Sequence, residues 1–176
     1  MAPDPLAHSD PIIQVYGADV WGWRGRFAIH TWIATKQRAA EAYVLYQVIG
    51  WRLRRGLPVV SINEGQPDKP WFGSEPSLLA DVRGVEVDAL IRRVDYAARE
   101  YPFAGEYTMW PGPNSNSFTA WIGLAVPELE LKLPFRALGK RWMHANYAQV
   151  KAGIKKQAKA RIGADGEAGP DGARDR

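Results

Sequence analysis

The sequence predicts an α+β fold, with an antiparallel sheet of about four to six strands packed against two or three helices. Two observations predict this class. The first half of the chain has short β-branched and aromatic stretches separated by turn-forming residues, and the second half has apolar residues at helical spacing. With 176 residues, of which 46% are hydrophobic, the chain is long enough for one domain with a sizeable core.

Four stretches near the N-terminus are typical of strands because they are rich in β-branched and aromatic residues. They are Ile12–Tyr16, Phe27–Thr35, Ala42–Ile49 and Pro58–Ile62. The connections between them are too short for helical crossovers, so we expect an antiparallel meander. Residues 63–75 contain several Gly and Pro residues and are predicted to form a loop.

Helical spacing of apolar residues begins at Val87 and continues until Pro102, which predicts one helix. A second helix is predicted after the segment Trp110–Phe118 and ends before Pro127. Two prolines in this segment disfavour helix, and Asn114 and Ser115 are both strong N-cap residues. The sequence therefore predicts a stiff loop that delivers Ser115 to the start of a helix.

The chain divides into four expected segments. Residues 1–11 are expected to form a flexible arm and residues 12–147 a single globular domain. A basic helix is expected over 148–162, and residues 163–176 lack the apolar content that would order them.

The net charge of +4 belongs mostly to the C-terminal end. Residues 151–176 carry seven Lys and Arg against four Asp and Glu, which leaves 16 basic and 15 acidic groups for the rest of the chain. Because the body is nearly neutral and no aromatic residues alternate with the basic ones of the tail, a nucleic-acid partner is not expected.

Several classes of site are excluded or unsupported. The chain has no cysteine, which excludes disulfides, thiolate metal sites and a cysteine nucleophile. His8 and His144 have no partner at metal-ligand spacing, and no nucleotide-binding motif occurs, so no cofactor is expected. No apolar run is long enough to span a membrane and no secretory signal is present, so we expect a cytoplasmic protein.

Two residues are candidates for chemistry. His30 lies within an apolar strand, where it is either a core histidine with a hydrogen-bond partner or a base. Ser115 is either a helix cap or a nucleophile, since the N–H groups at a helix start favour negative charge. A serine nucleophile needs a neighbouring base, and His30 is the plausible imidazole.

The eight tryptophans are expected to lie mostly in the core, with one or two bordering a groove. An aromatic groove suits a small molecule, a peptide or a glycan. We expect Trp32 and Trp110 to border such a cleft, and Asn114 or Asn116 to shape the loop or bind substrate.

Several blocks of the sequence resemble a bacterial family known as domain of unknown function 3750. The blocks span roughly residues 12 to 145, and the Pro-Gly-Pro-Asn-Ser-Asn block is the most specific of them. They are Trp21-Gly-Trp-Arg-Gly25, His30-Thr-Trp-Ile33, Val48-Ile-Gly-Trp-Arg52, Trp71-Phe-Gly73, Tyr101-Pro-Phe-Ala-Gly-Glu-Tyr107 and Trp110-Pro-Gly-Pro-Asn-Ser-Asn116.

The order of His30 and the Asn114-Ser115-Asn116 block also resembles circularly permuted papain-like hydrolases of the NlpC type. The resemblance implies a permuted papain-like fold, with His30 as the base and Ser115 as the nucleophile at a helix start. Serine stands here where those hydrolases carry cysteine. Gln47 is a candidate for orienting His30, and Glu41 and Glu64 are weaker candidates.

Two functions follow from these features. The first is an amide or ester hydrolase or acyltransferase with a His30/Ser115 site. The alternative is a non-catalytic binding module whose aromatic cleft holds a peptide, a glycan or a lipid head group, with Ser115 serving only as a cap. The substrate and the oligomeric state are left open by the sequence.

Overall fold

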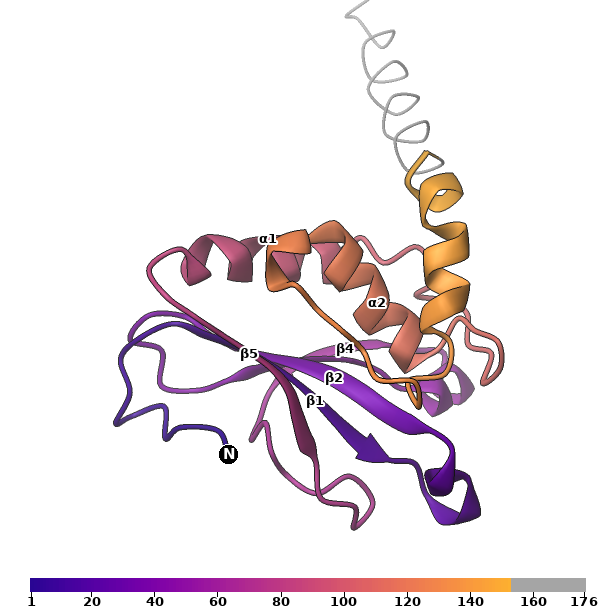
Figure 1. Ribbon diagram of the computed structural model, residues 1–176, viewed down its shortest axis with the longest axis horizontal. Coiled ribbons are helices and arrows are strands. Elements are labelled where there is room, and N and C mark those ends of the chain that lie inside the picture. The colour runs from indigo at the N-terminus through magenta and orange to yellow at the C-terminus, as the bar shows by residue number, and fades with distance from the viewer. Residues whose placement is uncertain (153–176) are drawn as a thin grey trace, which may run out of the picture.

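The computed structural model of the protein describes residues 1–152 and contains one five-stranded sheet in the order β4-β3-β2-β1-β5 (Figure 1). All neighbouring strands are antiparallel. The strands are β1 (Ile12–Asp19), β2 (Ile29–Lys36), β3 (Val44–Val48), β4 (Val60–Glu64) and β5 (Ser77–Arg83). The predicted α+β class and the meander of the first four strands are confirmed.

The strand β5 was not predicted. It pairs with β1 on the side away from β2, and its residues are half-buried or exposed. An edge strand of this kind has neither the continuous apolar run of a buried strand nor a clear alternation, so the sequence pattern does not reveal it.

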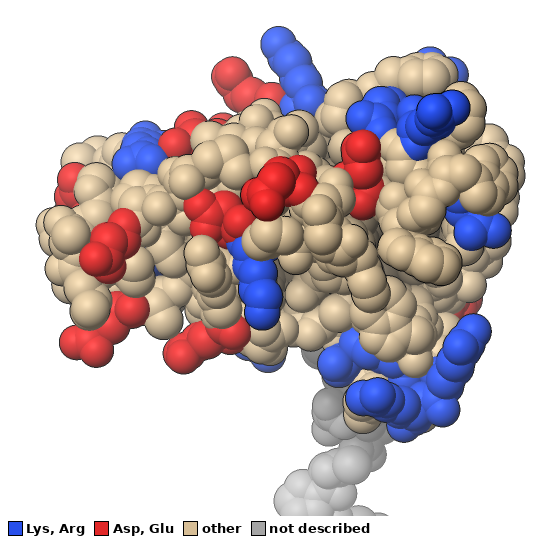
Figure 2. Space-filling view, turned by 90° about the horizontal axis from the view of Figure 1, so that it is seen from below, with Lys and Arg blue, Asp and Glu red and all other residues tan. Residues whose placement is uncertain are grey.

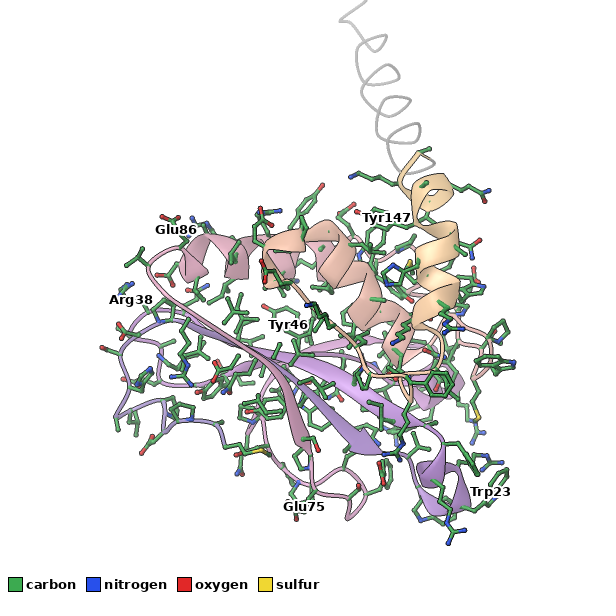
Figure 3. All side chains as sticks on the ribbon, viewed as in Figure 1. Trp23, Arg38, Tyr46, Glu75, Glu86 and Tyr147 are labelled. Carbon is green, nitrogen blue, oxygen red and sulfur yellow. The ribbon has the colours of Figure 1, made fainter. Side chains whose placement is uncertain are left out.

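The helices α1 (Val87–Arg99) and α2 (Ser115–Ala125) cover one face of the sheet (Figure 1). In α1 the buried residues Val87, Ile91, Val94 and Ala98 recur every three or four positions, which gives the helix one apolar side. Tyr46 points from β3 toward these helices (Figure 3), and its hydroxyl donates to Asp95 of α1 at 3.3 Å.

A short 3-10 turn, η3 (Pro127–Leu129), follows α2, and a further helix occupies residues 140–152. The Tyr147 hydroxyl donates to the Leu124 carbonyl at 3.1 Å, which holds this helix against α2. The helix therefore begins before residue 148, where the basic helix was expected. The remainder of that expected helix and the expected tail lie outside the described residues.

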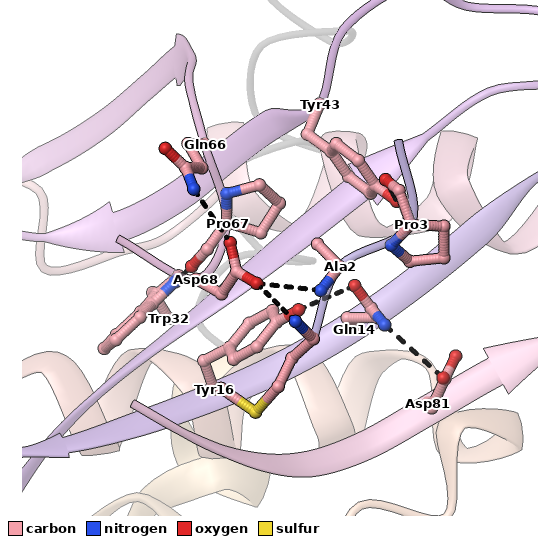
Figure 4. Close-up of polar contacts among 11 residues, drawn as sticks. Ala2, Pro3, Gln14, Tyr16, Trp32, Tyr43, Gln66, Pro67, Asp68 and Asp81 are labelled. Carbon is pink, nitrogen blue, oxygen red and sulfur yellow. Dashed lines mark hydrogen bonds and ion pairs between the residues drawn. The ribbon is translucent and has the colours of Figure 1, made fainter. Parts of the chain in front are cut away.

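The other face of the sheet is covered by the N-terminal segment and the β4–β5 connection. The Asp68 carboxylate accepts hydrogen bonds from the Met1 amino group at 2.7 Å and from the Ala2 N–H at 2.9 Å (Figure 4). In the same connection the Pro67 carbonyl accepts from the Trp32 indole N–H at 2.9 Å. Residues of the expected arm and the predicted loop thus pack together beneath the central strands.

Two 3-10 turns lie at one end of the sheet. The turn η1 (Gly22–Arg26) joins β1 to β2, and η2 (Gly50–Arg55) joins β3 to β4. Because β1 and β3 are each antiparallel to β2, both turns lie at the same end, which we call the turn end. In Figure 2 Lys and Arg gather toward this end of the molecule, whereas most Asp and Glu of the visible face lie toward the other end.

We expect Tyr101→Phe to leave the stability unchanged or to raise it slightly. The Tyr101 ring is buried against Phe118, with ring centroids 5.1 Å apart, and its hydroxyl has no hydrogen-bond partner within residues 1–152. Removing an unpaired buried hydroxyl removes its desolvation penalty.

Urea denaturation checks this expectation, with Tyr46→Phe as the matched control. Because the Tyr46 hydroxyl has a partner, that control should lose about 1 kcal/mol. A comparable loss in Tyr101→Phe would contradict the expectation.

Candidate functional site

The sheet opens between β2 and β3 at the turn end. The two strands pair only where residues 33–35 face residues 44–46, whereas β3 continues to pair with β4 as far as Val48. At Ile29, where β3 no longer pairs with β2, the backbone N–H and carbonyl bind groups from other parts of the chain. The Ile29 N–H donates to the Arg136 carbonyl at 3.1 Å, and the Ile29 carbonyl accepts from the Asn116 side-chain amide at 2.9 Å. We call this opening the β2–β3 gap.

Asn116 connects the start of α2 to both sequence neighbours of His30. Its amide nitrogen donates to the Ile29 carbonyl and also to the Leu138 carbonyl at 2.8 Å. Its amide oxygen accepts from the Thr31 hydroxyl at 2.9 Å. Since Ile29 and Thr31 flank His30 and Ser115 precedes Asn116, this one side chain brings the backbone at His30 and the backbone at Ser115 together at the gap.

Asn114 is the N-cap of α2. Its amide oxygen accepts from the backbone N–H groups of Asn116 at 3.0 Å and Ser117 at 3.1 Å, and its amide nitrogen donates to the Met109 carbonyl. The expectation that Ser115 only caps the helix is therefore corrected, because Asn114 performs that role. Gly139, at φ +103°, lies against the Asn114 amide where a side chain would not fit.

Ser115 is the first residue of α2 and is 5% exposed. Within the described residues neither its hydroxyl nor its backbone N–H forms a hydrogen bond, whereas its carbonyl accepts from the Thr119 hydroxyl. Within residues 1–152, two side-chain polar atoms are fully buried without a hydrogen-bond partner, the Tyr101 hydroxyl and Arg136 Nε. The Ser115 hydroxyl is not one of them. It therefore keeps some contact with solvent.

His30 lies on β2 and is 6% exposed. Side chains alternate along a strand, so His30 points to the face opposite Thr31. Its Nε2 lies 3.4 Å from the Gln47 amide oxygen on β3. An amide oxygen only accepts, so in the neutral ring Nε2 carries the proton and Nδ1 keeps a lone pair. Burial lowers the pKa of His30 to about 4, so the ring is neutral at neutral pH.

His30 and Ser115 are not hydrogen-bonded to each other in the part of the chain that the structure describes. The link between them runs through Asn116, which follows Ser115 in α2 and bonds to Ile29 and Thr31 on either side of His30. Of the three candidates for orienting His30, the structure brings Gln47 to the ring. Glu64 pairs with Val44 at the opposite end of β3, and Glu41 precedes that same end.

Trp71 covers His30, with ring centroids 3.9 Å apart and an interplanar angle of 8°. The sequence pattern does not predict this contact because Trp71 lies in the predicted loop. Trp71 and Ser74 exchange two backbone hydrogen bonds of 2.9 Å, which closes a two-residue hairpin turn. Phe72 and Gly73 at its apex have φ values of +48° and +82°, as in a type I′ turn. Gly73, at the second central position of the turn, is the sequence signal that indicates this hairpin.

The aromatic contacts continue outward from Trp71. Trp51 of η2 stacks on Trp71 with centroids 5.9 Å apart, and Phe72 meets Trp51 edge to face at 5.7 Å. Trp32 is buried on the inner side, 5.8 Å from His30. Trp110 is 66% exposed on the loop before α2 and is not part of this stack. The structure therefore brings Trp32 to His30 and leaves Trp110 at the surface.

Within residues 1–152 no group of three His, Asp or Glu side chains is placed to hold a metal ion. None of the helices in those residues is both long and apolar enough to cross a membrane.

Residues 10–142 match the family described as "Protein of unknown function (DUF3750)". The chain therefore belongs to this family, which confirms the resemblance carried by the sequence blocks. No curated protein and no solved structure matches the chain.

Replacing Asn116 by Ala is expected to destabilise the protein by roughly 2–4 kcal/mol, because buried partners in β2 and at Leu138 lose their hydrogen bonds. Chemical denaturation measures the change. Asn146→Ala is the matched control, since its amide donates only to the Trp142 carbonyl of its own helix. Equal losses in the two variants would show that Asn116 does not hold the gap together.

The low pKa of His30 makes stability depend on pH. Between pH 6.5 and about 4 the unfolded chain binds a proton that the folded chain does not, so stability falls as the pH falls through this window. The loss from this group is about 3 kcal/mol, and it is complete below the folded-state pKa.

The free energy of unfolding of the unmodified chain is compared with that of His30→Gln, which has no titrating group at this position. The free energy of unfolding of the two proteins should converge, or cross, as the pH is lowered. A constant difference between them from neutral pH to pH 4 would contradict the buried neutral imidazole.

Proposed function

We propose that this member of the DUF3750 family carries an acyl-transfer site, in which Ser115 is the nucleophile and His30 is the base. The substrate class is an amide or an ester, and the protein acts as a hydrolase or acyltransferase. The observation that carries the proposal is the Asn116 bridge, which ties the residues on both sides of His30 to the residue after Ser115.

In this proposal His30 accepts the Ser115 proton at Nδ1, which requires the Ser115 hydroxyl to reach the imidazole face of β2 through the β2–β3 gap. Its Nε2–H is directed at Gln47, which fixes the tautomer and leaves the Nδ1 lone pair for this role. His30 is unprotonated at neutral pH because burial lowers its pKa to about 4, which also makes it a weaker base than an ordinary imidazole. Trp71 stacks on the ring and limits its contact with water.

Charge on the substrate oxygen would be stabilised by the start of α2. When the Ser115 hydroxyl attacks a carbonyl carbon, its proton passes to His30 and the carbonyl oxygen becomes negative. The Ser115 N–H has no acceptor among the described residues, and the positive end of the helix lies at the same place. These two features favour the tetrahedral intermediate.

Asn114 and Asn116 have a positioning role in this proposal. Both side chains are buried, and their amide groups are bonded to the protein itself. They hold Ser115 at the gap rather than bind substrate. Trp110 is exposed on the loop that leads to Ser115 and is available for contact with a substrate.

The resemblance to permuted NlpC-type hydrolases supports the same assignment of His30 and Ser115. Those enzymes use a cysteine, whose thiolate forms more easily than a serine alkoxide. In this chain the start of α2 and the Ser115 N–H, which has no acceptor within residues 1–152, would have to compensate for the weaker nucleophile.

The second candidate function is binding without catalysis. It is favoured by the aromatic stack, which continues from the buried His30 through Trp71 to the exposed Trp51 and Phe72. Exposed aromatic rings of this kind bind glycans, peptides and lipid head groups. In that case Ser115 would not react with an acylating or phosphonylating reagent.

A serine-directed fluorophosphonate distinguishes the two functions. The acyl-transfer proposal expects an adduct on Ser115, located by peptide mass spectrometry, and its loss in His30→Gln. Ser117→Ala is the matched control in the same helical turn and should still be labelled, because the Ser117 hydroxyl is occupied by the Gly139 carbonyl. Labelling that persists in His30→Gln, or no adduct on the unmodified chain, would favour binding alone.

The absence of cysteine offers a second test. Ser115→Cys introduces a single thiol, whose pKa follows from the pH dependence of its alkylation by iodoacetamide. The start of α2 should lower that pKa below the ordinary value of about 8.5. Transfer of the thiol proton to His30 Nδ1, which forms a thiolate–imidazolium pair, should lower it further, so His30→Gln should reverse part of the shift. Ser9→Cys, in the N-terminal segment, provides the reference thiol. An unshifted or raised pKa at position 115 would exclude an activated nucleophile there.

A further inference from the structure

The turn end carries many large apolar side chains that do not pack into the core. Trp21 and Trp23 flank the first residue of η1 and are 74% and 72% exposed. Trp23 projects away from the rest of the molecule at the outer end of that turn (Figure 3). Trp51 and Leu53 of η2 are also exposed. Large exposed apolar side chains gathered at one end of a folded domain indicate a binding surface.

Two further segments add exposed apolar groups at the same end. The loop before α2 exposes Met109 and Trp110, and Phe135 is 76% exposed beside Arg136, whose carbonyl binds the Ile29 N–H at the start of β2. These side chains come from separate loops that meet at one end of the sheet. The exposed apolar surface is therefore a property of the turn end and not of one segment.

All charged residues of the two turns η1 and η2 are basic. In η1 the basic residues are Arg24 and Arg26, and in η2 they are Arg52, Arg54 and Arg55, with no Asp or Glu in either turn. None of these five arginines forms an ion pair within residues 1–152. Figure 2 shows the same distribution on the surface, with Lys and Arg gathered toward this end.

We propose that the turn end docks onto the surface of an anionic lipid membrane. Tryptophan prefers the head-group region of a bilayer, where its ring is partly dehydrated and its N–H still finds an acceptor. Guanidinium groups bind lipid phosphates, and basic residues near an anionic surface gain further from its negative potential. Exposed tryptophans beside unpaired arginines therefore match an anionic bilayer in both apolar and charged groups.

The alternative partner for a basic aromatic surface is single-stranded nucleic acid, and the side-chain types argue against it. Nucleic-acid sites combine a basic groove with rings that stack on successive bases. Here Trp21 and Trp23 at η1 are separate from Trp51 of η2, and the non-aromatic apolar residues Leu53, Leu57 and Met109 accompany them. Aliphatic tips enter the acyl region of a bilayer but do not stack on bases.

Docking in this way does not require the acyl-transfer assignment, because none of the arginines or of Trp21 and Trp23 belongs to the proposed catalytic group. It would place the β2–β3 gap, at the same end of the sheet, close to the lipid surface.

Vesicle co-sedimentation tests the proposal with the full chain. The protein is mixed with vesicles of phosphatidylcholine that contain phosphatidylglycerol, and separately with vesicles of phosphatidylcholine alone. We expect partitioning to the anionic vesicles to be roughly tenfold stronger or more, and to weaken as salt is added.

Two double variants separate the contribution of the basic residues from that of the tryptophans. Arg54→Glu with Arg55→Glu should remove most of the preference for anionic vesicles. Trp21→Ser with Trp23→Ser should weaken binding to both kinds of vesicle by about tenfold, because the interfacial anchors are lost. The matched control, Arg92→Glu with Tyr96→Ser, changes exposed side chains of α1 and should bind as the unmodified chain does.

Three results would overturn the proposal. The first is equal sedimentation of the unmodified chain with and without either kind of vesicle. The second is unchanged vesicle binding in both turn-end variants. The third is tighter binding to a single-stranded oligonucleotide than to anionic vesicles, lost in the same variants, which would make the turn end a nucleic-acid surface. Far-ultraviolet circular dichroism verifies that each variant is folded.

Discussion

The pairing of the Ile29 backbone in the β2–β3 gap is the constraint on which the site depends. A buried backbone N–H and carbonyl must find partners, and here they find the Arg136 carbonyl and the Asn116 amide instead of a strand. This explains why the first turn of α2 is both polar and buried. Asn116, Ser117 and Thr119 satisfy the sheet and the 136–139 segment, so the helix can begin at the gap rather than above the sheet.

His30 lies between two layers that are formed by distant parts of the chain. From one face, the start of α2 fixes Thr31 and Ile29, and from the other face the Trp71–Ser74 hairpin covers the imidazole. Burial from both sides makes the neutral ring the stable form, and Gln47 selects its tautomer without adding charge. A carboxylate at the position of Gln47 would favour the imidazolium instead.

The sequence predicted those parts of the fold that rest on local patterns. The β-branched runs of β1 to β4, the apolar spacing of α1 and the proline-stiffened entry to α2 each lie within one segment, so their signals can be read directly. The edge strand β5 has a weak pattern, and the stack of Trp71 on His30 joins residues far apart in the chain. Asn114 and Ser115 are both good caps, and only tertiary contacts to Met109 and Gly139 decide between them.

Phe72 at the hairpin apex combines backbone strain with an aromatic contact. A bulky residue at positive φ is disfavoured by about 1 kcal/mol, whereas Asn or Gly would adopt this conformation with little strain. The chain nevertheless places an exposed ring there, against Trp51 and Trp71. A selection for thermal stability alone would therefore be expected to replace Phe72 early, and the resulting proteins would be more stable but would lose the ring contacts with Trp51 and Trp71.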